Sequence, residues 1–435
     1  MTRIAWAAFL AGVLLAPACL AEQTEVQQTL ENCLRIRLKP IPKAEQIALT
    51  VLFDVGEDQD PEGMSGLAHL VEHLYVTAAA GEGKARTVRE YMERYPQGWN
   101  AQTGDRFTVI ATVFPPEKLE EELADAAARM GDLRITEADL EREKPRMLEE
   151  LRNMFGGMPA LAARNLAREL CRPSPAGARK GGIPDQVRRI TVAQVRDRWT
   201  RFYKPRNALI VLAGKFDADA AGKSLALAFS GLPSGETAPD PRPGEKPRAG
   251  VLEEVSIEPA GGSPPPELCL AFPVPPPGDA LYAPFLVLAA KIVLRAMKKD
   301  GAGGADCYPA SFSPIDDPSV FYVSGPVLPG ETGEQAVERL QRLVSDPLKE
   351  GLKPRDTTMA RSVFCLQLGT APFMETMQAG NAYGAGFSLG RREQMGIDSK
   401  TLIQAINSVK QEDLARAAKA CFDPSRRSAA IVRAR

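Results

Sequence analysis

The sequence has little that a nucleic-acid-binding protein needs. Its 54 lysines and arginines are balanced by 55 aspartates and glutamates, so the formal net charge is −1. Nucleic-acid-binding domains usually carry a basic excess, and proteins that bind single strands also stack bases on aromatic rings. Aromatic residues make up only 6% of this chain. We therefore expect no nucleic acid among its partners.

Long apolar runs are confined to the N-terminus, and no later segment has the ~20 uninterrupted apolar residues that a membrane helix requires. Arg3, the apolar stretch Ile4–Leu15 and the small residues that follow have the layout of a secretory signal peptide, which we expect to span residues 1–21. Cleavage there would release the protein into a bacterial periplasm or outside the cell. Cleavage before Cys19 would instead give a lipoprotein, and only this lipidation would attach the chain to a membrane.

Cysteine pairs with metal-binding spacing are also absent. The seven cysteines are scattered without a CxxC motif, which argues against a cysteine-based metal site. Six remain if the signal peptide is removed. One or two disulfides would suit an oxidising compartment, but the sequence leaves their pairing open.

At 435 residues the chain is too long for one ordinary core, and length favours two or more domains. The stretch 234–266 is rich in proline, glycine and charge, which predicts a linker between an N-terminal half, 22–233, and a C-terminal half, 267–435. Both halves close with a helical stretch, an aromatic residue, a proline and an apolar run, at 191–214 and 410–435. We interpret this as an internal duplication, although a chance coincidence is the alternative.

Strand-like and helix-like patterns mix within the first half, which predicts an α+β fold. The expected strands are 33–41, 46–56 and Arg106–Phe114, and the expected helices are Pro116–Met130 and Thr136–Met154. Thr136 with Asp139 makes a capping box for the second helix.

The whole chain has only two histidines, His69 and His73, in the segment GLAHLVEHLYV. Side chains four residues apart share one helix face, so both imidazoles can reach one Zn²⁺ at the ~2.0–2.1 Å of a zinc–nitrogen bond. Glu72 precedes the second histidine, where a carboxylate can reach a metal-bound water without being a ligand. Chance would give this arrangement roughly a few times in ten thousand, which disfavours a helix whose histidines merely form hydrogen bonds.

A catalytic zinc usually takes three protein ligands, and no third histidine exists. The segment EKPRMLEELRNM offers carboxylates instead. Glu143 and Glu150 are two helical turns apart and share a face, whereas Glu149 points about 100° away. On spacing alone, a solvated helix face is the alternative for each of them.

These motifs resemble the insulinase/pitrilysin family of zinc peptidases, which includes the mitochondrial processing peptidases, and above all its shorter bacterial members. SGLAHLVEHL matches the zinc helix of that family. The resemblance implies one Zn²⁺ per chain, with His69, His73 and Glu150 as its ligands. It also implies that Glu72 activates the zinc-bound water and that Glu143 helps to orient the site.

The resemblance extends to substrate-binding residues but is less regular there. Asn100 begins the segment NAQT, which implies a role in binding the substrate beside an edge strand. The family also uses an Arg and a Tyr seven apart in its second half. Tyr308 matches the tyrosine, but Gly301 stands where the arginine would be, and Arg295 is the nearest substitute. A further departure is Pro145, which should kink the helix that carries Glu150.

The family fold implies two homologous halves, each a mainly antiparallel sheet packed against helices, that close like a clamshell on a peptide. We therefore expect a metalloendopeptidase that cuts unfolded or short peptides, working alone, as a homodimer or with a related subunit. One alternative is a family member that no longer cuts and serves as a partner subunit or peptide-binding scaffold. Another is a metal-dependent hydrolase of a non-peptide substrate.

Overall fold

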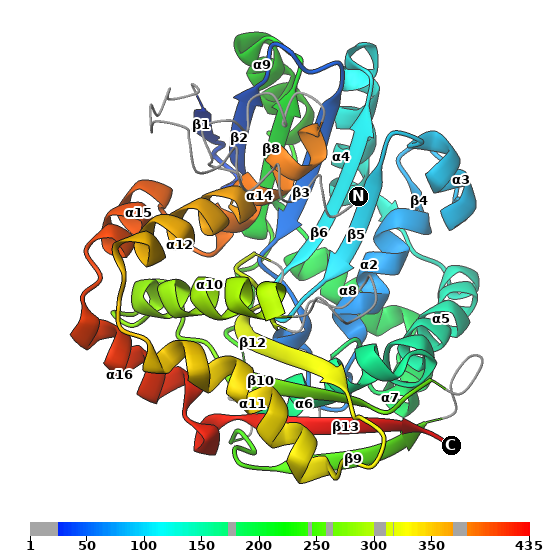
Figure 1. The fold of residues 1–435 in the computed structure, drawn as a ribbon. Helices are drawn as coiled ribbons and strands as arrows, with labels where there is room; N and C mark the ends of the chain where they lie inside the picture. The colour runs from blue at the N-terminus through cyan, green and yellow to red at the C-terminus, as the bar shows by residue number, and fades with distance from the viewer. Residues whose placement is uncertain are drawn as a thin grey trace.

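The computed structural model describes residues 25–172, 180–241, 246–257, 264–299, 310–315, 317–368 and 381–435. They form two halves of mixed α/β structure, each built around its own main sheet (Figure 1). The expected signal peptide, with Cys19, lies outside the described residues. Within the described ranges, no helix is both long and apolar enough to cross a membrane.

The first sheet has six strands in the order β1-β2-β8-β3-β6-β5. Only β2 and β8 run parallel; every other neighbouring pair is antiparallel. The strands at its centre are apolar and fully buried, which confirms the strand prediction from their sequence pattern. The bounds are β1 Val26–Thr29, β2 Arg35–Pro40, β3 Ile47–Phe53, β5 Trp99–Thr103, β6 Thr108–Phe114 and β8 Ala208–Gly214.

The second sheet repeats this topology with five strands in the order β11-β12-β10-β13-β9. Again one pair, β9 and β13, is parallel, and the remaining pairs are antiparallel. Matching the parallel pairs places β9, β13, β10, β12 and β11 on β2, β8, β3, β6 and β5, which supports the duplication. The bounds are β9 Leu252–Ile257, β10 Glu267–Pro273, β11 Ala310–Ser313, β12 Asp317–Pro326 and β13 Ser428–Ala434.

The matching also bears on the stretch 234–266, which the sequence predicts as a linker. Strand β9 lies inside that stretch and pairs with β13 through a parallel register. Part of the segment therefore belongs to the second sheet, and its half-exposed side chains explain why composition alone does not reveal it. The boundaries between the two halves stay a prediction.

The two similar chain endings do fold alike. In the first half α8, Val192–Phe202, leads through the 3-10 turn η4, Pro205–Asn207, into β8. In the second half α16, Gln411–Phe422, leads through η5, Pro424–Arg426, into β13. The proline suits the first position of each turn because its fixed φ and missing N–H cost nothing there.

Helices cover both sheets. In the first half they are α2 Leu67–Thr77, α3 Val88–Arg94, α4 Leu119–Gly131, α5 Glu137–Arg152, α6 Pro159–Cys171, α7 Pro184–Arg189, α8 and α9 Ala218–Phe229. In the second half they are α10 Tyr282–Lys299, α11 Gly333–Lys349, α12 Pro354–Gln367, α14 Ala382–Gln394, α15 Ser399–Asn407 and α16. The remaining short elements are η1 Glu57–Gln59, β4 Ala79–Ala80, η2 Pro116–Lys118, β7 Leu133–Arg134 and η3 Asn153–Gly157.

Each half also lends one helix to the sheet of the other. Helix α6 of the first half packs on β10 and β13, and α14 of the second half packs on β3 and β8 (Figure 1). Both contacts use small residues. Ala163 and Ala167 of α6 are fully buried against the second sheet, and a Cβ at Gly390 of α14 would come within 2.5 Å of the Leu52 side chain. The halves are therefore held together by close helix-on-sheet packing.

Among the cysteines, Cys33, Cys269 and Cys421 take part in no disulfide. Two others, Cys19 and Cys307, lie outside the described residues. The structure thus keeps several thiols out of any disulfide framework.

The packing of α6 generates a prediction about how the halves are joined. Ala163→Leu adds three carbons to a filled interface, and overpacking of this kind typically costs about 1–3 kcal/mol. We expect the urea midpoint of Ala163→Leu to fall. Ala160→Leu changes an exposed alanine of the same helix and should leave the midpoint close to that of the unmodified protein. Equal midpoints for the two variants would contradict the tight packing of α6 on the second sheet.

Candidate metal centre

Helix α2 carries both histidines and buries almost every side chain. Its N-cap, Gly66, has a positive φ of 98° and no side chain to satisfy the first N–H groups. The Asp60 carboxylate does so instead: it accepts from the N–H groups of Gly66, Leu67 and Ala68 at 2.9, 3.1 and 3.0 Å. The Ser65 N–H donates to the side-chain oxygen of Gln186 at 2.7 Å. The start of the helix is therefore fixed by a buried carboxylate six residues upstream.

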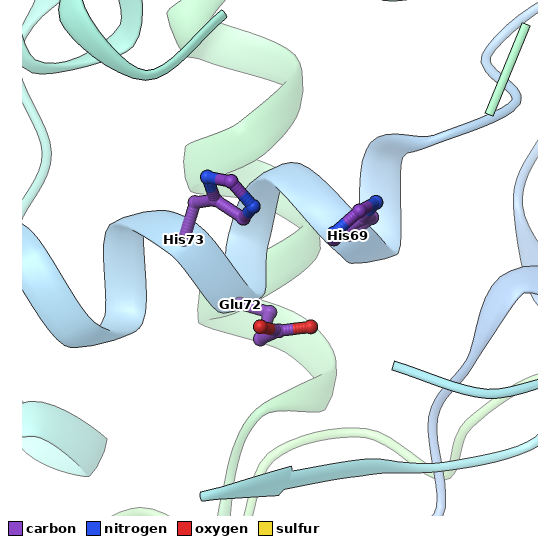
Figure 2. A group of neighbouring side chains, drawn as sticks. All are labelled: His69, Glu72 and His73. Carbon is purple, nitrogen blue, oxygen red and sulfur yellow. The ribbon is translucent and has the colours of Figure 1, made fainter. Parts of the chain in front are cut away.

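The three side chains of the motif gather at one place along this helix. Figure 2 shows His69, Glu72 and His73 projecting from neighbouring turns of α2. One ligand atom from each lies within 4.8 Å of those of the other two. His69 and Glu72 are each only 6% exposed, so their polar atoms are largely shielded from water.

Helix α5 supplies the carboxylates. Glu150 Oε1 lies 3.7 Å from His69 Nε2, and Glu150 Oε2 lies 3.5 Å from His73 Nε2. Glu143 lies two turns before Glu150 on the same face of α5. It is fully buried, and its Oε2 lies 3.4 Å from His73 Nδ1. Pro145 lies between them without ending the helix, which runs from its Thr136–Asp139 capping box to Arg152. The fold thus brings together the carboxylates that spacing and resemblance pointed to.

The second nitrogen of each ring reveals which nitrogen is available for a metal. His69 Nδ1 is 3.0 Å from the carbonyl oxygen of Gly181, which can only accept, so Nδ1 carries the proton. His73 Nδ1 faces the Glu143 carboxylate in the same way. A neutral imidazole with a protonated Nδ1 has its lone pair on Nε2. With both Nδ1 atoms engaged, Nε2 is the nitrogen of each ring that faces Glu150 and that a metal would take.

The separations suit a tetrahedral zinc ion. Two ligand atoms about 2.1 Å from such an ion lie about 3.4 Å apart. The two distances from histidine Nε2 atoms to Glu150 oxygens, 3.5 and 3.7 Å, are close to that value. Two imidazoles with one carboxylate is a donor set found in catalytic zinc sites, with a fourth position left for water. The residues present therefore fit a zinc ion.

Charge around the rings favours a cation as well. Burial by itself would lower the pKa of His73, but the carboxylates of Glu143 and Glu150 raise it to about 9. The hydrogen bond to His73 in turn lowers the pKa of Glu150. Burial by itself would raise the pKa of Glu143, but His73 and the Arg146 guanidinium lower the pKa of that carboxyl below its usual value. The site is thus an acidic cluster that needs a positive charge at its centre, from a proton or from a metal.

Glu72 is held from the opposite side by Thr103. The Thr103 hydroxyl donates to Glu72 Oε2 at 2.6 Å, which fixes the carboxylate against strand β5. Side chains alternate along a strand, so Trp99, Ala101 and Thr103 face α2 while Asn100 faces away. The amide of Asn100 donates instead to the hydroxyl of Tyr383 in α14, at 3.0 Å. The expected substrate residue therefore bonds the other half of the chain, and its part in substrate binding stays a prediction.

A cavity of about 550 Å³ adjoins the site. Ligand candidates and apolar side chains both line it. Its lining consists of His73, Arg146, Glu149, Glu150, Asn153, Met154, Met158 and Leu161. His73 and Glu150 both line the cavity, so a molecule in it would lie beside the proposed metal position.

The structure gives less support to the candidate substrate-binding residues of the second half, Arg295 and Tyr308. Arg295 forms an ion pair with Glu350 at 3.6 Å, and its side chain is more than half exposed. Its charge thus has a partner on the surface of its own half. Tyr308 and Gly301 lie outside the described residues. Sequence reasoning also missed Asp60, Gly181 and Tyr383. The Asp60 carboxylate bonds backbone N–H groups as far as 8 residues along the chain, and the Gly181 carbonyl meets His69 across 112 residues, and no local pattern signals such contacts.

Comparison with protein families gives two matches along the chain. Residues 35–178 match a model described as insulinase (peptidase family M16). Residues 189–363 match one described as the peptidase M16 inactive domain. Together the two models account for most of the chain.

Curated relatives are named as proteases. The chain is 26% identical over 247 residues to PqqL, a probable zinc protease of Escherichia coli. The aligned region covers 53% of this chain and 25% of that protein. The chain is 27% identical over 191 residues to the zinc protease PqqE of Helicobacter pylori, with 43% and 42% covered. An uncharacterized zinc protease of Rickettsia bellii is 23% identical over 214 residues, with 48% and 50% covered. The matched regions thus span half or less of these relatives.

Solved structures share the fold over nearly the whole chain. A protease from Helicobacter pylori superposes with a TM-score of 0.75 at 18% identity, covering 94% of this chain and 99% of that one. The first half of the periplasmic protease PqqL from Escherichia coli gives 0.68 at 18% identity, covering 96% and 93%. With two family matches, curated zinc-protease relatives and this shared two-domain fold, the chain belongs to the insulinase family, peptidase family M16.

Proposed function

We propose that this protein is a zinc metalloendopeptidase that hydrolyses peptide bonds in unfolded or short peptides. His69, His73 and Glu150 would hold one Zn²⁺, and Glu72 would serve as the general base. The observation that carries the proposal is the position of the Glu150 carboxylate, within 3.7 Å of both Nε2 atoms. The naming of its relatives as zinc proteases supports the same conclusion.

A zinc ion bound there would lower the pKa of a water molecule toward ~7 and polarise the scissile carbonyl. In this proposal Glu72 accepts the proton of the attacking water and passes it to the leaving amine. Its hydrogen bond from Thr103 keeps one carboxylate oxygen engaged and so fixes the direction of the other. Glu143 orients the His73 ring through Nδ1 and is itself held by Arg142 and Arg146.

Strand β5 offers a place for the substrate backbone. It ends the first sheet, and among the described residues no strand pairs with its outer edge. A peptide that adds to such an edge gains main-chain hydrogen bonds with little demand on its sequence, which suits an extended, unfolded substrate. Thr103, at the end of this strand, contacts Glu72, so a peptide on this edge would run close to the general base.

One observation favours a second function, that of a partner subunit or peptide-binding scaffold that does not cut. Gly301 stands where the family resemblance implies an arginine, and such a guanidinium would stabilise the developing oxyanion. A related subunit, or a second copy of the chain, could supply the missing charge. Activity measured with the protein alone and together with a related subunit separates the two functions.

We also propose that the protein works in the periplasm. The apolar N-terminal layout of residues 1–21 supports export, and the solved relative PqqL is described as periplasmic. A lipoprotein anchored through Cys19 is the alternative, and the mass of the mature N-terminus distinguishes the two.

The division of roles predicts different effects of two acidic substitutions. Glu72→Gln removes the base but no ligand, so the variant should keep zinc close to one per chain and lose peptidase activity by at least about 100-fold. Zinc content by elemental analysis and cleavage of a quenched unstructured peptide test this. A Glu72→Gln protein that has lost its zinc would contradict the assignment of Glu72 as a base.

Glu150→Gln should instead weaken metal binding. Loss of an outer partner of a zinc ligand already costs ~10–100-fold in affinity, and loss of a charged ligand should cost at least as much. Glu149→Gln is the matched control, because Glu149 is adjacent, exposed and paired with Arg152. Chelator competition measures the two affinities. If both variants bind zinc as the unmodified protein does, Glu150 is not a ligand.

Metal uptake should depend on pH through His73. Because the pKa of this ring is raised to about 9, the metal-free protein carries a proton on it at neutral pH, and zinc must displace that proton. The affinity should therefore rise by about tenfold per pH unit from pH 7 up to about 9 and then level off. Calorimetry in buffers of different ionisation enthalpy counts the released proton. An affinity that stays flat between pH 7 and 9 would contradict this coupling.

A further inference from the structure

We propose that Glu57 is a positioning residue for the zinc ligand His69, acting through the backbone of Gly181. The inference rests on the proposed zinc site and extends it to a buried carboxyl group outside the motif. Glu57 Oε1 accepts a hydrogen bond from the Gly181 N–H at 2.8 Å. The carbonyl oxygen of the same residue accepts from His69 Nδ1 at 3.0 Å. One backbone residue therefore connects the Glu57 carboxyl group to the imidazole.

Gly181 is closely packed, with no space for a side chain. Its φ is 78°, and a Cβ there would come within 2.6 Å of the side chain of Leu151, the residue that follows Glu150. The neighbouring Gly182, with φ 124°, would place a Cβ 2.8 Å from the Cα of Gly66. The segment 181–182 thus lies wedged between the start of α2 and the end of α5. The hydrogen bond from Glu57 fixes its direction on the remaining side.

Burying the Glu57 carboxyl group at this position costs free energy of folding. Its side chain is 4% exposed, and its Oε2 is buried without a hydrogen-bond partner in the described part of the chain. Burial, and next to it the nearby Asp105 carboxylate, raise the pKa of Glu57 to about 8. A buried polar oxygen without a partner costs free energy, which an apolar side chain of similar size would avoid. The hydrogen bond from Gly181 offsets part of that cost, and it is the contact through which Glu57 would orient His69.

The surroundings of Glu57 tie this contact to the rest of the molecule. Arg168 of α6 and Arg172, which follows that helix, both donate to the Asp105 carboxylate at 2.6 Å, and α6 packs its apolar face on the second sheet. Asp105 accepts from the Asp58 N–H through its carbonyl oxygen at 2.8 Å, beside Glu57 in η1. The turn η1, which carries Glu57, is therefore connected through Asp105 to α6, the helix that packs on the second half. Glu57 in turn bonds the Gly181 N–H.

Three variants separate positioning from general stability. Glu57→Gln keeps the shape and the acceptor oxygen, so it should preserve the hydrogen bond. Glu57→Leu removes the acceptor. Asp58→Asn is the matched control, because Asp58 is equally buried in the same turn but bonds Arg172 rather than Gly181.

The first measurement does not depend on metal. His69 and His73 are the only histidines of the chain, so ¹⁵N-labelled histidine gives two ring spin systems that one substitution assigns. In the zinc-free protein the neutral His69 ring should show a protonated Nδ1 in the unmodified chain, in Glu57→Gln and in Asp58→Asn. In Glu57→Leu it should shift toward a mixture of the two tautomers. An unchanged His69 tautomer in Glu57→Leu would overturn the proposal.

The second measurement is zinc affinity by chelator competition. Glu57→Leu should bind zinc at least about tenfold more weakly, as expected for loss of an outer partner of a ligand, while Glu57→Gln and Asp58→Asn should stay within about threefold. Equal weakening in Asp58→Asn would mean a structural effect and would overturn the positioning role. If the unmodified protein binds no zinc, the proposed function fails, while the tautomer data still decide whether Glu57 orients His69.

Discussion

The site depends on how closely α5 lies against α2. Glu143, Met147 and Glu150 occupy one face of α5 at spacings of four and three residues, and that face meets the histidines. Met147 is fully buried between the two carboxylates, and a Cβ at Gly66 would come within 2.8 Å of its terminal methyl carbon. Glycine at position 66 therefore lets the helices approach until a carboxylate of one reaches the imidazoles of the other.

Electrostatics then determines what this close approach can do. Each histidine has its Nδ1 bound to an acceptor, the Gly181 carbonyl or the Glu143 carboxylate, and both Nε2 atoms face Glu150. The cluster is short of positive charge, which is why the pKa of His73 is raised. A divalent cation satisfies the same carboxylates with more charge than a proton, and the partners of the two Nδ1 atoms already turn both Nε2 atoms toward Glu150.

Much of this site can be predicted from the sequence, because its main parts are local. His69, Glu72 and His73 lie within one helical segment, and Glu143 and Glu150 share a face by spacing alone. The alternating apolar runs likewise predict the central strands of the first sheet. Pairing across the two helices comes only from family resemblance. The roles of Asp60, Glu57 and Gly181 could not be predicted, since they depend on contacts between side chains and backbone groups that tertiary packing brings together. Strand β9 was missed because a half-exposed edge strand in a proline- and glycine-rich stretch leaves little pattern.

The duplicated architecture links the two halves around the site. Each half packs one helix on the sheet of the other, so the half that carries α2 and α5 contacts the second half at two helix-on-sheet interfaces. X-ray absorption at the zinc edge of the loaded protein tests the central claim most directly. We expect scattering from two imidazoles and one or two oxygen ligands at about 2.0–2.2 Å, with the carboxylate contribution lost in Glu150→Gln. A spectrum with fewer than two imidazoles, or one unchanged by that substitution, would contradict the account.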